Sequence, residues 1–246
     1  MDKIKDINLK ETFNLGVQNH QNNNIDKAQD YYQNVLKIDP DHLGTNYNLG
    51  VIFQELGEYQ KAKDCYEKAI EIDPNNVSTY YNLGNIFKEL REYQKAKDCY
   101  EKAIEIDPNH ANTHNNLGVV FKELGDLRKA MSCYEKVIEI NPNHVDAHNN
   151  HGNIFLELGD LRKALSCYKK ALEINPNYVN AHHNLGNIFQ ELKDHQKAKD
   201  CYENAIKINP NHVDAHNNLL KSLFELNDKS NLFKELDSII KEGKMN

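Results

Sequence analysis

The apolar residues of this chain recur at intervals of three and four positions in short segments, and two such segments fit into every 34 residues. One pair runs from Tyr80 to Leu90 and from Tyr93 to Ile104. This spacing predicts two amphipathic helices that pack against each other as a hairpin. Because the pair of segments returns along almost the whole chain, the pattern predicts an all-α protein built from helical hairpins.

Proline marks the period, because all six prolines lie 34 residues apart, from Pro40 to Pro210. Counted from Leu9 as position 1, proline holds position 32, glycine recurs at position 8 and alanine at position 20. We expect residues 1–8 to be an N-terminal leader and residues 9–246 to form a single array. The repeats are 9–42, 43–76, 77–110, 111–144, 145–178 and 179–212, followed by a degenerate capping repeat, 213–246.

Two kinds of helix breaker separate the predicted helices. A glycine such as Gly57 closes the first helix in a left-handed conformation, and Asp-Pro or Asn-Pro ends the second. Arg91 and Lys193 replace that glycine in two repeats, at a cost of about 1 kcal/mol each if the conformation is kept. We expect the small residues at positions 8 and 20 to let the two helices cross closely. The last helix, about 230–241, is expected to be a solvating cap.

The combined pattern resembles the tetratricopeptide repeat family. Leu-Gly at positions 7 and 8, an aromatic residue at 11, Ala at 20, Tyr at 24 and Pro at 32 agree in several successive copies. The resemblance implies a right-handed α-solenoid of helix-turn-helix hairpins whose first helices line a concave groove for protein partners. No phosphate-binding glycine loop, nucleophile elbow or catalytic triad stands out, so we expect a non-catalytic scaffold without a cofactor.

Positions 2, 5, 6, 9, 12 and 13 of the first helix fall on the arc opposite its apolar face. Position 6 is asparagine in every repeat, although asparagine is a mediocre helix former. Two interpretations stay open: recent duplication copied a neutral residue, or a column of amides binds the backbone of an extended peptide. The column consists of Asn14, Asn48, Asn82, Asn116, Asn150, Asn184 and Asn218.

Positions 5 and 9 supply the other candidate groove residues. The two tyrosines among them predict an N-terminal half that is more adhesive to apolar or aromatic side chains. Glutamate at position 13 of six repeats disfavours a strongly acidic partner. The candidates are Tyr47, Tyr81, Asn115, Asn149 and His183 at position 5, and Asn85, Asn153 and Asn187 at position 9.

The asparagine column is also similar to the repeat region of protein O-GlcNAc transferases. This resemblance gives an alternative function, a substrate-recruiting arm of such a glycosylation system. The catalytic domain of that system is absent from this chain, and so the interaction scaffold is the preferred interpretation.

Charge and composition narrow the partners further. The net charge of −7 argues against nucleic acid, because phosphate binding needs a surplus of basic residues on one face. No signal peptide and no apolar run long enough to span a membrane is present, so we expect neither a membrane contact nor a location outside the cytoplasm.

The cysteines and histidines raise the question of disulfides, redox sites and metal sites, none of which we expect. The five cysteines hold position 23 of successive repeats, too far apart for disulfides, and are expected to be free, buried thiols rather than metal or redox sites. Histidines four residues apart, such as His110 and His114, resemble metal ligands on one helix turn. However, the first lies in a turn and the second on a packed arc, so no metal site is expected.

Overall fold

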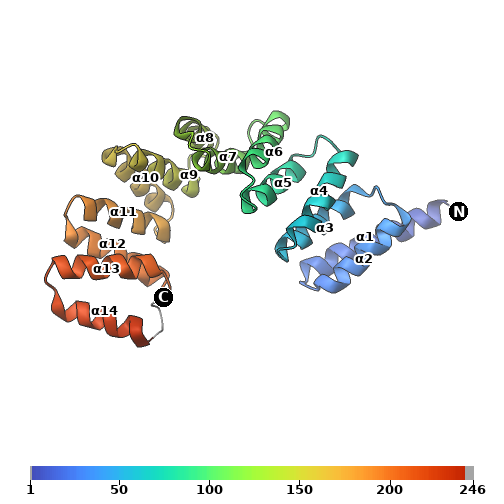
Figure 1. The fold of residues 1–246 in the computed structure, drawn as a ribbon. Helices are drawn as coiled ribbons and strands as arrows, with labels where there is room; N and C mark the ends of the chain where they lie inside the picture. Colours follow the sequence, from blue (N-terminus) through green and yellow to red (C-terminus); the bar gives the residue numbers. More distant parts are fainter. Residues whose placement is uncertain (1, 242–246) are drawn as a thin grey trace. The chain divides into compact units, whose positions relative to one another are not determined.

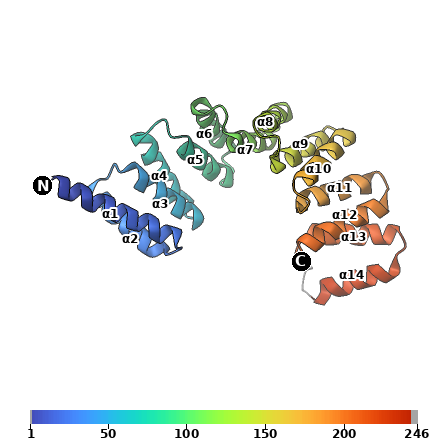
Figure 2. The same cartoon turned by 180° about the vertical axis from the view of Figure 1, so that it is seen from behind.

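The computed structural model describes residues 2–241, and within that range the chain forms fourteen α-helices and no strand. Figure 1 shows the helices following one another as hairpins in chain order, and Figure 2 shows the same order from behind. The all-α hairpin solenoid predicted from the apolar spacing is thereby confirmed. Odd-numbered helices are the first helices of the repeats: α1 (Asp2–Gln21), α3 (Leu43–Glu55), α5 (Val77–Glu89), α7 (Ala111–Glu123), α9 (Val145–Glu157), α11 (Val179–Glu191) and α13 (Val213–Glu225). Even-numbered helices are the second ones: α2 (Ile25–Ile38), α4 (Tyr59–Ile72), α6 (Tyr93–Ile106), α8 (Leu127–Ile140), α10 (Leu161–Ile174), α12 (His195–Ile208) and α14 (Lys229–Lys241).

The chain forms two compact units, residues 1–125 and 126–246. Unit 1 contains α1 to α7, and unit 2 contains α8 to α14. The boundary lies in the turn between α7 and α8, inside the predicted repeat 111–144. Within the units, the second helix of a repeat packs between the first helix of its own repeat and the first helix of the next, as α6 does between α5 and α7 and α10 does between α9 and α11. Residues 2–8 of the predicted leader are helical, because α1 begins at Asp2.

The helices end where the predicted breakers stand. At the end of α6, Asp107 is extended with φ −128°, and Pro108 follows it. The turn inside each hairpin is left-handed, with φ 72° at Gly57 and 59° at both Arg91 and Lys193. Arg91 and Lys193 therefore keep the conformation that the glycines take elsewhere, which was left open by the sequence.

The glycine at position 8 packs against the ring of the tyrosine at position 24, a contact that the expected close crossing of the two helices did not specify. Tyr100, at position 24 of its repeat, is fully buried, and a Cβ atom added to Gly84 would lie 2.5 Å from its Cε1 atom. Gly186 and Tyr202 repeat this arrangement at 2.4 Å. The absent side chain thus makes room for a tyrosine in the core of the hairpin, and Ala96 at position 20 is buried beside it.

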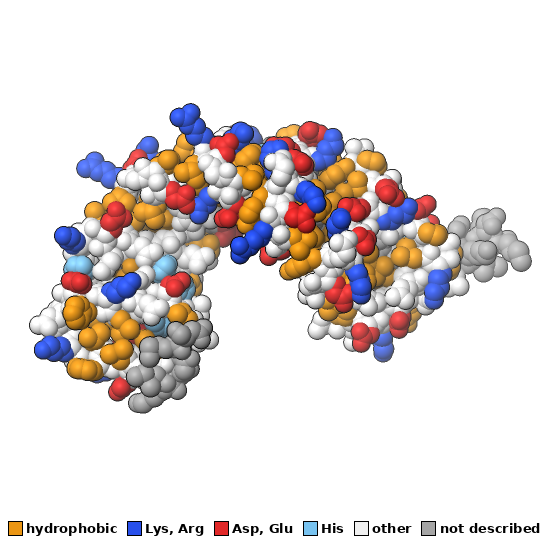
Figure 3. Space-filling view, viewed as in Figure 1, with side chains coloured by type: hydrophobic (Ala, Val, Ile, Leu, Met, Phe, Trp, Pro, Cys, Tyr) orange, Lys and Arg blue, Asp and Glu red, His pale blue; other side chains and the backbone are white. Residues whose placement is uncertain are grey.

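The C-terminal helix α14 carries a strongly exposed aromatic residue, which a solvating cap is not expected to have. Phe233 on α14 is 64% exposed, and Phe224 on α13 is 70% exposed. Both line a cavity of about 250 Å³ together with Leu223 and Leu232. Figure 3 shows hydrophobic side chains gathered over these helices. Phe233 is thus an exposed apolar residue on the helix expected to be a solvating cap, whose other exposed side chains within the described residues are polar: Lys229, Ser230, Lys234 and Asp237.

Candidate functional site

The first-helix face of each unit is the surface formed by positions 2, 5, 6, 9, 12 and 13 of its first helices, and it carries the asparagine column. Of the column, Asn14 is exposed, whereas the members from Asn48 to Asn218 are half-buried. The column is therefore less exposed than the arc of an isolated helix predicts. The reason is a contact with the preceding repeat, which an arc drawn for one helix does not contain. Hydrogen bonds to the preceding repeat are formed by Asn48, Asn82, Asn116, Asn184 and Asn218.

Hydrogen bonds between repeats hold the column in place. The Nδ2 atom of Asn116 donates to Asn85 Oδ1 at 2.8 Å, and the hydroxyl of Tyr100 donates to the same oxygen at 2.7 Å. We call this set of three residues an amide clasp: a tyrosine at position 24, an asparagine at position 9 of the same repeat, and the column asparagine of the next repeat. Because the tyrosine is buried and the amides are half-buried, these bonds stabilise the junction between repeats.

Unit 2 contains two further amide clasps. In one, Asn184 Nδ2 lies 3.1 Å from Asn153 Oδ1, to which Tyr168 donates at 2.7 Å. The other consists of Tyr202, Asn187 and Asn218, with donor–acceptor distances of 2.9 and 3.1 Å. The structure thus brings together the predicted candidates at positions 6 and 9, but it directs their amides at each other.

Two asparagines of unit 1 keep an open acceptor. Asn48 donates to the hydroxyl of Tyr32 at 3.1 Å, and Asn82 donates to the hydroxyl of Tyr47 at 3.1 Å. Neither Oδ1 atom has a hydrogen-bond partner within the described residues. Neither is among the side-chain atoms buried without a partner, which are Glu58 Oε2 and His151 Nε2 in the described chain. Both oxygens are therefore open to solvent, on side chains whose nitrogen is fixed from behind.

Aromatic rings flank these open oxygens. Tyr47 lies with its ring centroid 6.0 Å from that of Tyr66, and Tyr81 lies 6.2 Å from Tyr100 and 5.3 Å from His110. Both position-5 tyrosines are half-buried, so part of each ring faces solvent. The surface on α3 and α5 therefore presents hydrogen-bond acceptors next to aromatic carbon.

The position-5 residues beyond Tyr81 differ in exposure and partners. Asn149 is 4% exposed, and its Oδ1 atom accepts a hydrogen bond from Asn184 Nδ2 at 3.0 Å. This predicted groove residue therefore lies inside the junction between repeats. His183 is half-buried, with its ring 5.0 Å from that of His212, and burial lowers its pKa. Asn115 is also half-buried and donates to Asn116 Oδ1 at 3.4 Å.

The carboxylates at position 13 form an exposed acidic row on each unit. Glu89 lies 3.8 Å from Lys88, and Glu123 accepts a hydrogen bond from Tyr93 at 3.3 Å. Like charges in such a row disfavour a strongly acidic ligand. The exposed members are Glu55, Glu89, Glu123, Glu157, Glu191 and Glu225.

Most histidines fasten the turns between repeats. At position 4, Nε2 of His148 lies 2.9 Å from the carbonyl oxygen of Pro142, and His182 and His216 contact their prolines at the same distance. At position 34, His144 Nδ1 accepts the backbone N–H of Ala147 at 3.2 Å, which caps α9. This role was missed from the sequence, although a signal existed: position 4 is His or Asn in five repeats, six residues after the proline of the preceding turn.

The described residues contain no group of three or more His, Cys, Asp or Glu side chains arranged to hold a metal ion. The five cysteines are free, as predicted. Burial raises the pKa of Cys65, Cys167 and Cys201 to about 11 and that of Cys99 to about 12. Since the thiolate is the reactive form, these thiols are poor nucleophiles and poor metal ligands at neutral pH.

His151 is the exception to leucine at position 7. It is 9% exposed, its ring lies 4.5 Å from that of Phe155, and its Nε2 atom is buried without a hydrogen-bond partner in the described chain. Burial lowers its pKa. A neutral imidazole thus occupies an apolar core position.

No helix within residues 2–241 combines the length and apolar character needed to cross a bilayer.

Models of known protein families match this chain repeat by repeat. Models of the tetratricopeptide repeat match residues 13–42, 45–76, 77–110, 111–144, 133–166 and 179–212. A further model, described as a TPR repeat, matches residues 152–193. These models do not bear on the resemblance to glycosyltransferases. No curated protein sequence gives a significant match.

Solved structures agree with the family models. The crystal structure of MamA is 30% identical over 66% of this chain and 95% of MamA, with a TM-score of 0.63. YrrB, described as a TPR protein with an unusual peptide-binding site, is 26% identical over 75% of this chain and 95% of YrrB, with a TM-score of 0.59. PilF of Pseudomonas aeruginosa, 20% identical over 87% of this chain and 97% of its own, shares the fold with a TM-score of 0.73. With most of its repeats matched by the models, this chain belongs to the tetratricopeptide repeat family.

Proposed function

We propose that this protein is a non-catalytic interaction scaffold that binds an extended segment of a protein partner on the first-helix face, chiefly on α3 and α5 of unit 1. The observation that carries the proposal is the pair of solvent-open Oδ1 atoms of Asn48 and Asn82, each on an amide fixed from behind by a tyrosine hydroxyl. Fixed acceptors bind a ligand at a lower entropy cost than mobile ones.

The spacing of these acceptors suits an extended peptide. Asn48 and Asn82 hold the same position in successive repeats, and packed helices lie about 10 Å apart. An extended chain advances by about 3.3 Å per residue, so backbone N–H groups about three residues apart match the two oxygens. Recognition through the backbone tolerates different side chains, and the rings of Tyr47 and Tyr81 favour an apolar or aromatic one.

Charge and family support the same kind of partner. The exposed glutamates at position 13 favour a ligand that is not strongly acidic. The likeness to YrrB, whose description names a peptide-binding site, supports peptide recognition by a related repeat array. The cytoplasm is the proposed location, which the five free thiols favour because disulfides are rare there.

The test uses the ligand's backbone, so that the protein stays unchanged. A peptide selected from a random library against the intact protein is resynthesised with single N-methyl groups, and each version is titrated by calorimetry. We expect N-methylation at two positions about three residues apart to weaken binding, each by about 0.5 to 1.5 kcal/mol for a lost hydrogen bond. Equal affinity for every N-methylated peptide contradicts backbone recognition.

Protein variants then locate the site. Asn48→Ala together with Asn82→Ala should weaken binding by about tenfold or more, because two hydrogen bonds are lost. Asn184→Ala is the matched control, since it changes the same repeat position in unit 2 and should leave the affinity unchanged. If only Asn184→Ala weakens binding, the ligand lies on unit 2 and the assignment to α3 and α5 is wrong.

A further inference from the structure

The last turns of the second helices carry a repeated ion pair. In four successive repeats, from 43–76 to 145–178, position 26 is lysine and position 29 is glutamate. The nitrogen–oxygen distances are 3.2 Å for Lys68–Glu71, 2.6 Å for Lys102–Glu105, 3.0 Å for Lys136–Glu139 and 3.1 Å for Lys170–Glu173. In each of these repeats the glutamate neutralises the lysine at the edge of the array.

The repeat 179–212 departs from this pattern. Its position 26 is Asn204 and its position 29 is Lys207, so that a cation stands where the preceding repeats carry an anion. Within the described residues, Lys207 forms no ion pair with a carboxylate. The positive charge at the end of α12 is therefore left without an acidic partner in the described part of the chain.

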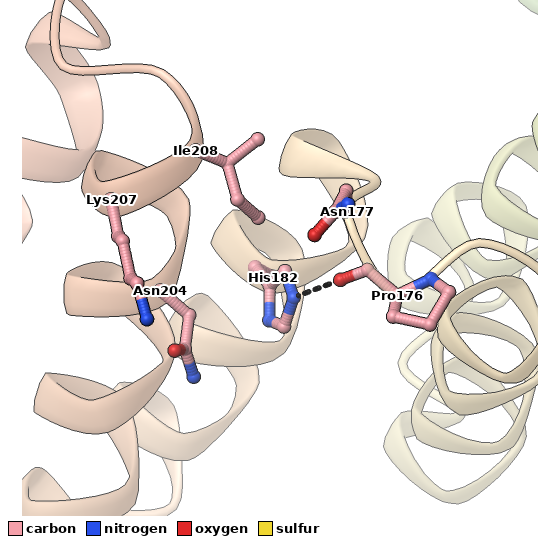
Figure 4. A pocket seen from close by; sticks show the side chains of 6 residues that line it. All are labelled: Pro176, Asn177, His182, Asn204, Lys207 and Ile208. Carbon is pink, nitrogen blue, oxygen red and sulfur yellow. Dashed lines mark hydrogen bonds between the residues drawn. The ribbon is translucent and has the colours of Figure 1, made fainter.

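A cavity of about 420 Å³ lies beside this lysine. Figure 4 shows Asn204 and Lys207 on one side of it and His182 and Asn177 on the other. None of its lining residues is acidic, and Pro176 and Ile208 supply apolar wall.

The wall of this cavity is fixed by hydrogen bonds. His182 Nε2 lies 2.9 Å from the carbonyl oxygen of Pro176, and the backbone N–H of Asn177 donates to Asn175 Oδ1 at 3.0 Å. The first bond ties the first turn of α11 to the turn that precedes it, and the second bond lies within that turn. The cavity is thus a preformed space with one cation, two carboxamides and no competing anion.

We propose that this cavity is a second binding site, separate from the first-helix face, and that it takes the carboxylate of an acidic side chain from a protein partner. One lysine matches one monoanion, with the amides of Asn177 and Asn204 as neutral donors. A phosphate dianion is usually held by more than one cation or by arginine, and neither is present here. The apolar wall suits the methylene groups that precede a glutamate carboxylate.

The proposal is tested with small probes on the intact protein. N-acetyl-glutamate N-methylamide is titrated into ¹⁵N-labelled protein, and the amide shifts of Asn177, Asn204 and Lys207 are followed. We expect saturable shifts there with millimolar affinity, and much smaller shifts with the corresponding glutamine compound. Equal shifts with the glutamine compound overturn the carboxylate assignment, and so does tighter binding of inorganic phosphate in a third titration.

Variants provide the second arm of the experiment. Asn204→Lys combined with Lys207→Glu restores the ion pair found in four other repeats, so the fold should tolerate it, and the saturable shifts should disappear. The matched control is Asn34→Lys combined with Lys37→Glu, the same two changes at positions 26 and 29 of the first repeat, where Lys37 donates to Asn34 Oδ1 at 3.0 Å. Loss of binding in both variants indicates a general charge effect and overturns the site. Binding of the peptide selected for the first-helix face should be unchanged in both.

Discussion

The N-terminal repeats of unit 1 and the C-terminal repeats of unit 2 hold the column asparagine of the first-helix face with different hydrogen-bond partners. In unit 1, Asn48 and Asn82 are anchored by tyrosine hydroxyls and keep an open oxygen. In unit 2, Asn184 and Asn218 are anchored by carboxamides in complete amide clasps. Asn116 on α7 of unit 1 forms an amide clasp as well, so the same residue at the same repeat position bonds to a tyrosine hydroxyl on α3 and α5 and to a carboxamide on α7, α11 and α13. Identity of residue at a repeat position does not imply identity of role.

The largest expected effect concerns what the units share, the glycine that faces a buried tyrosine. Gly84→Leu in unit 1 and Gly186→Leu in unit 2 should each destabilise by about 3 kcal/mol, because the new side chain overlaps the ring. Urea unfolding measures the change. Equal losses are expected in both variants, and an unchanged unfolding midpoint in either one contradicts the core described for that unit.

The next effect concerns the amide clasp itself. Asn153→Val removes the shared acceptor of Tyr168 and Asn184, so we expect a loss of about 2 kcal/mol, because the buried Tyr168 hydroxyl loses its partner and Asn184 keeps only its bond to Asn149. Val51→Asn places an acceptor at the same repeat position in unit 1 and should not destabilise. If both variants unfold like the parent, the clasp contributes nothing to stability and the comparison of the units fails.

A difference in pH response should follow from the histidines of unit 2. The folded pKa of His151 lies below the unfolded value of 6.5, so the unfolded chain binds the proton more readily. Stability from the neutral ring is therefore full above pH 6.5 and is lost as the pH falls through the folded pKa. Around the ring, Glu135 raises the pKa, whereas His148 and Lys163 lower it further.

This response is measured by hydrogen exchange of individual amides at neutral and mildly acidic pH. Amides of α9 and α10 should lose protection on acidification, whereas amides of α3 and α5, which have no such buried histidine, should change less. His151→Leu should restore the acid stability of unit 2. Unchanged protection of α9 in acid speaks against a buried neutral imidazole.

The smallest expected effect lies in the hairpin turns. Arg91→Gly and Lys193→Gly relieve a left-handed conformation that costs a non-glycine residue about 1 kcal/mol, but they also raise the entropy of the unfolded chain. A net gain of about 0.5 kcal/mol is expected in each unit from thermal unfolding. A loss in either variant means that the long side chain makes a stabilising contact.

The repeat period was sufficient to predict the hairpins, their left-handed turns and the free thiols, because each of these depends on residues close together in sequence. The partners of the column asparagines were not predictable in this way. Asn116 bonds to Asn85, which lies 31 residues earlier and one repeat away. A helical arc drawn for one helix contains no neighbouring repeat, so it overestimated the exposure of the column and of Asn149. The contact of Gly84 with Tyr100 was missed because an arc drawn for one helix does not contain the second helix of the same hairpin either.

The five cysteines also make the protein a ready subject for local probing. Each stands at the same position of a different repeat and is buried or half-buried. Burial raises the thiol pKa of Cys65, Cys99, Cys167 and Cys201. An alkylating reagent modifies such a thiol mainly when its surroundings open. The alkylation rates of the five thiols therefore report how often each hairpin opens locally, and no engineered label is needed. The five thiols are Cys65, Cys99, Cys133, Cys167 and Cys201.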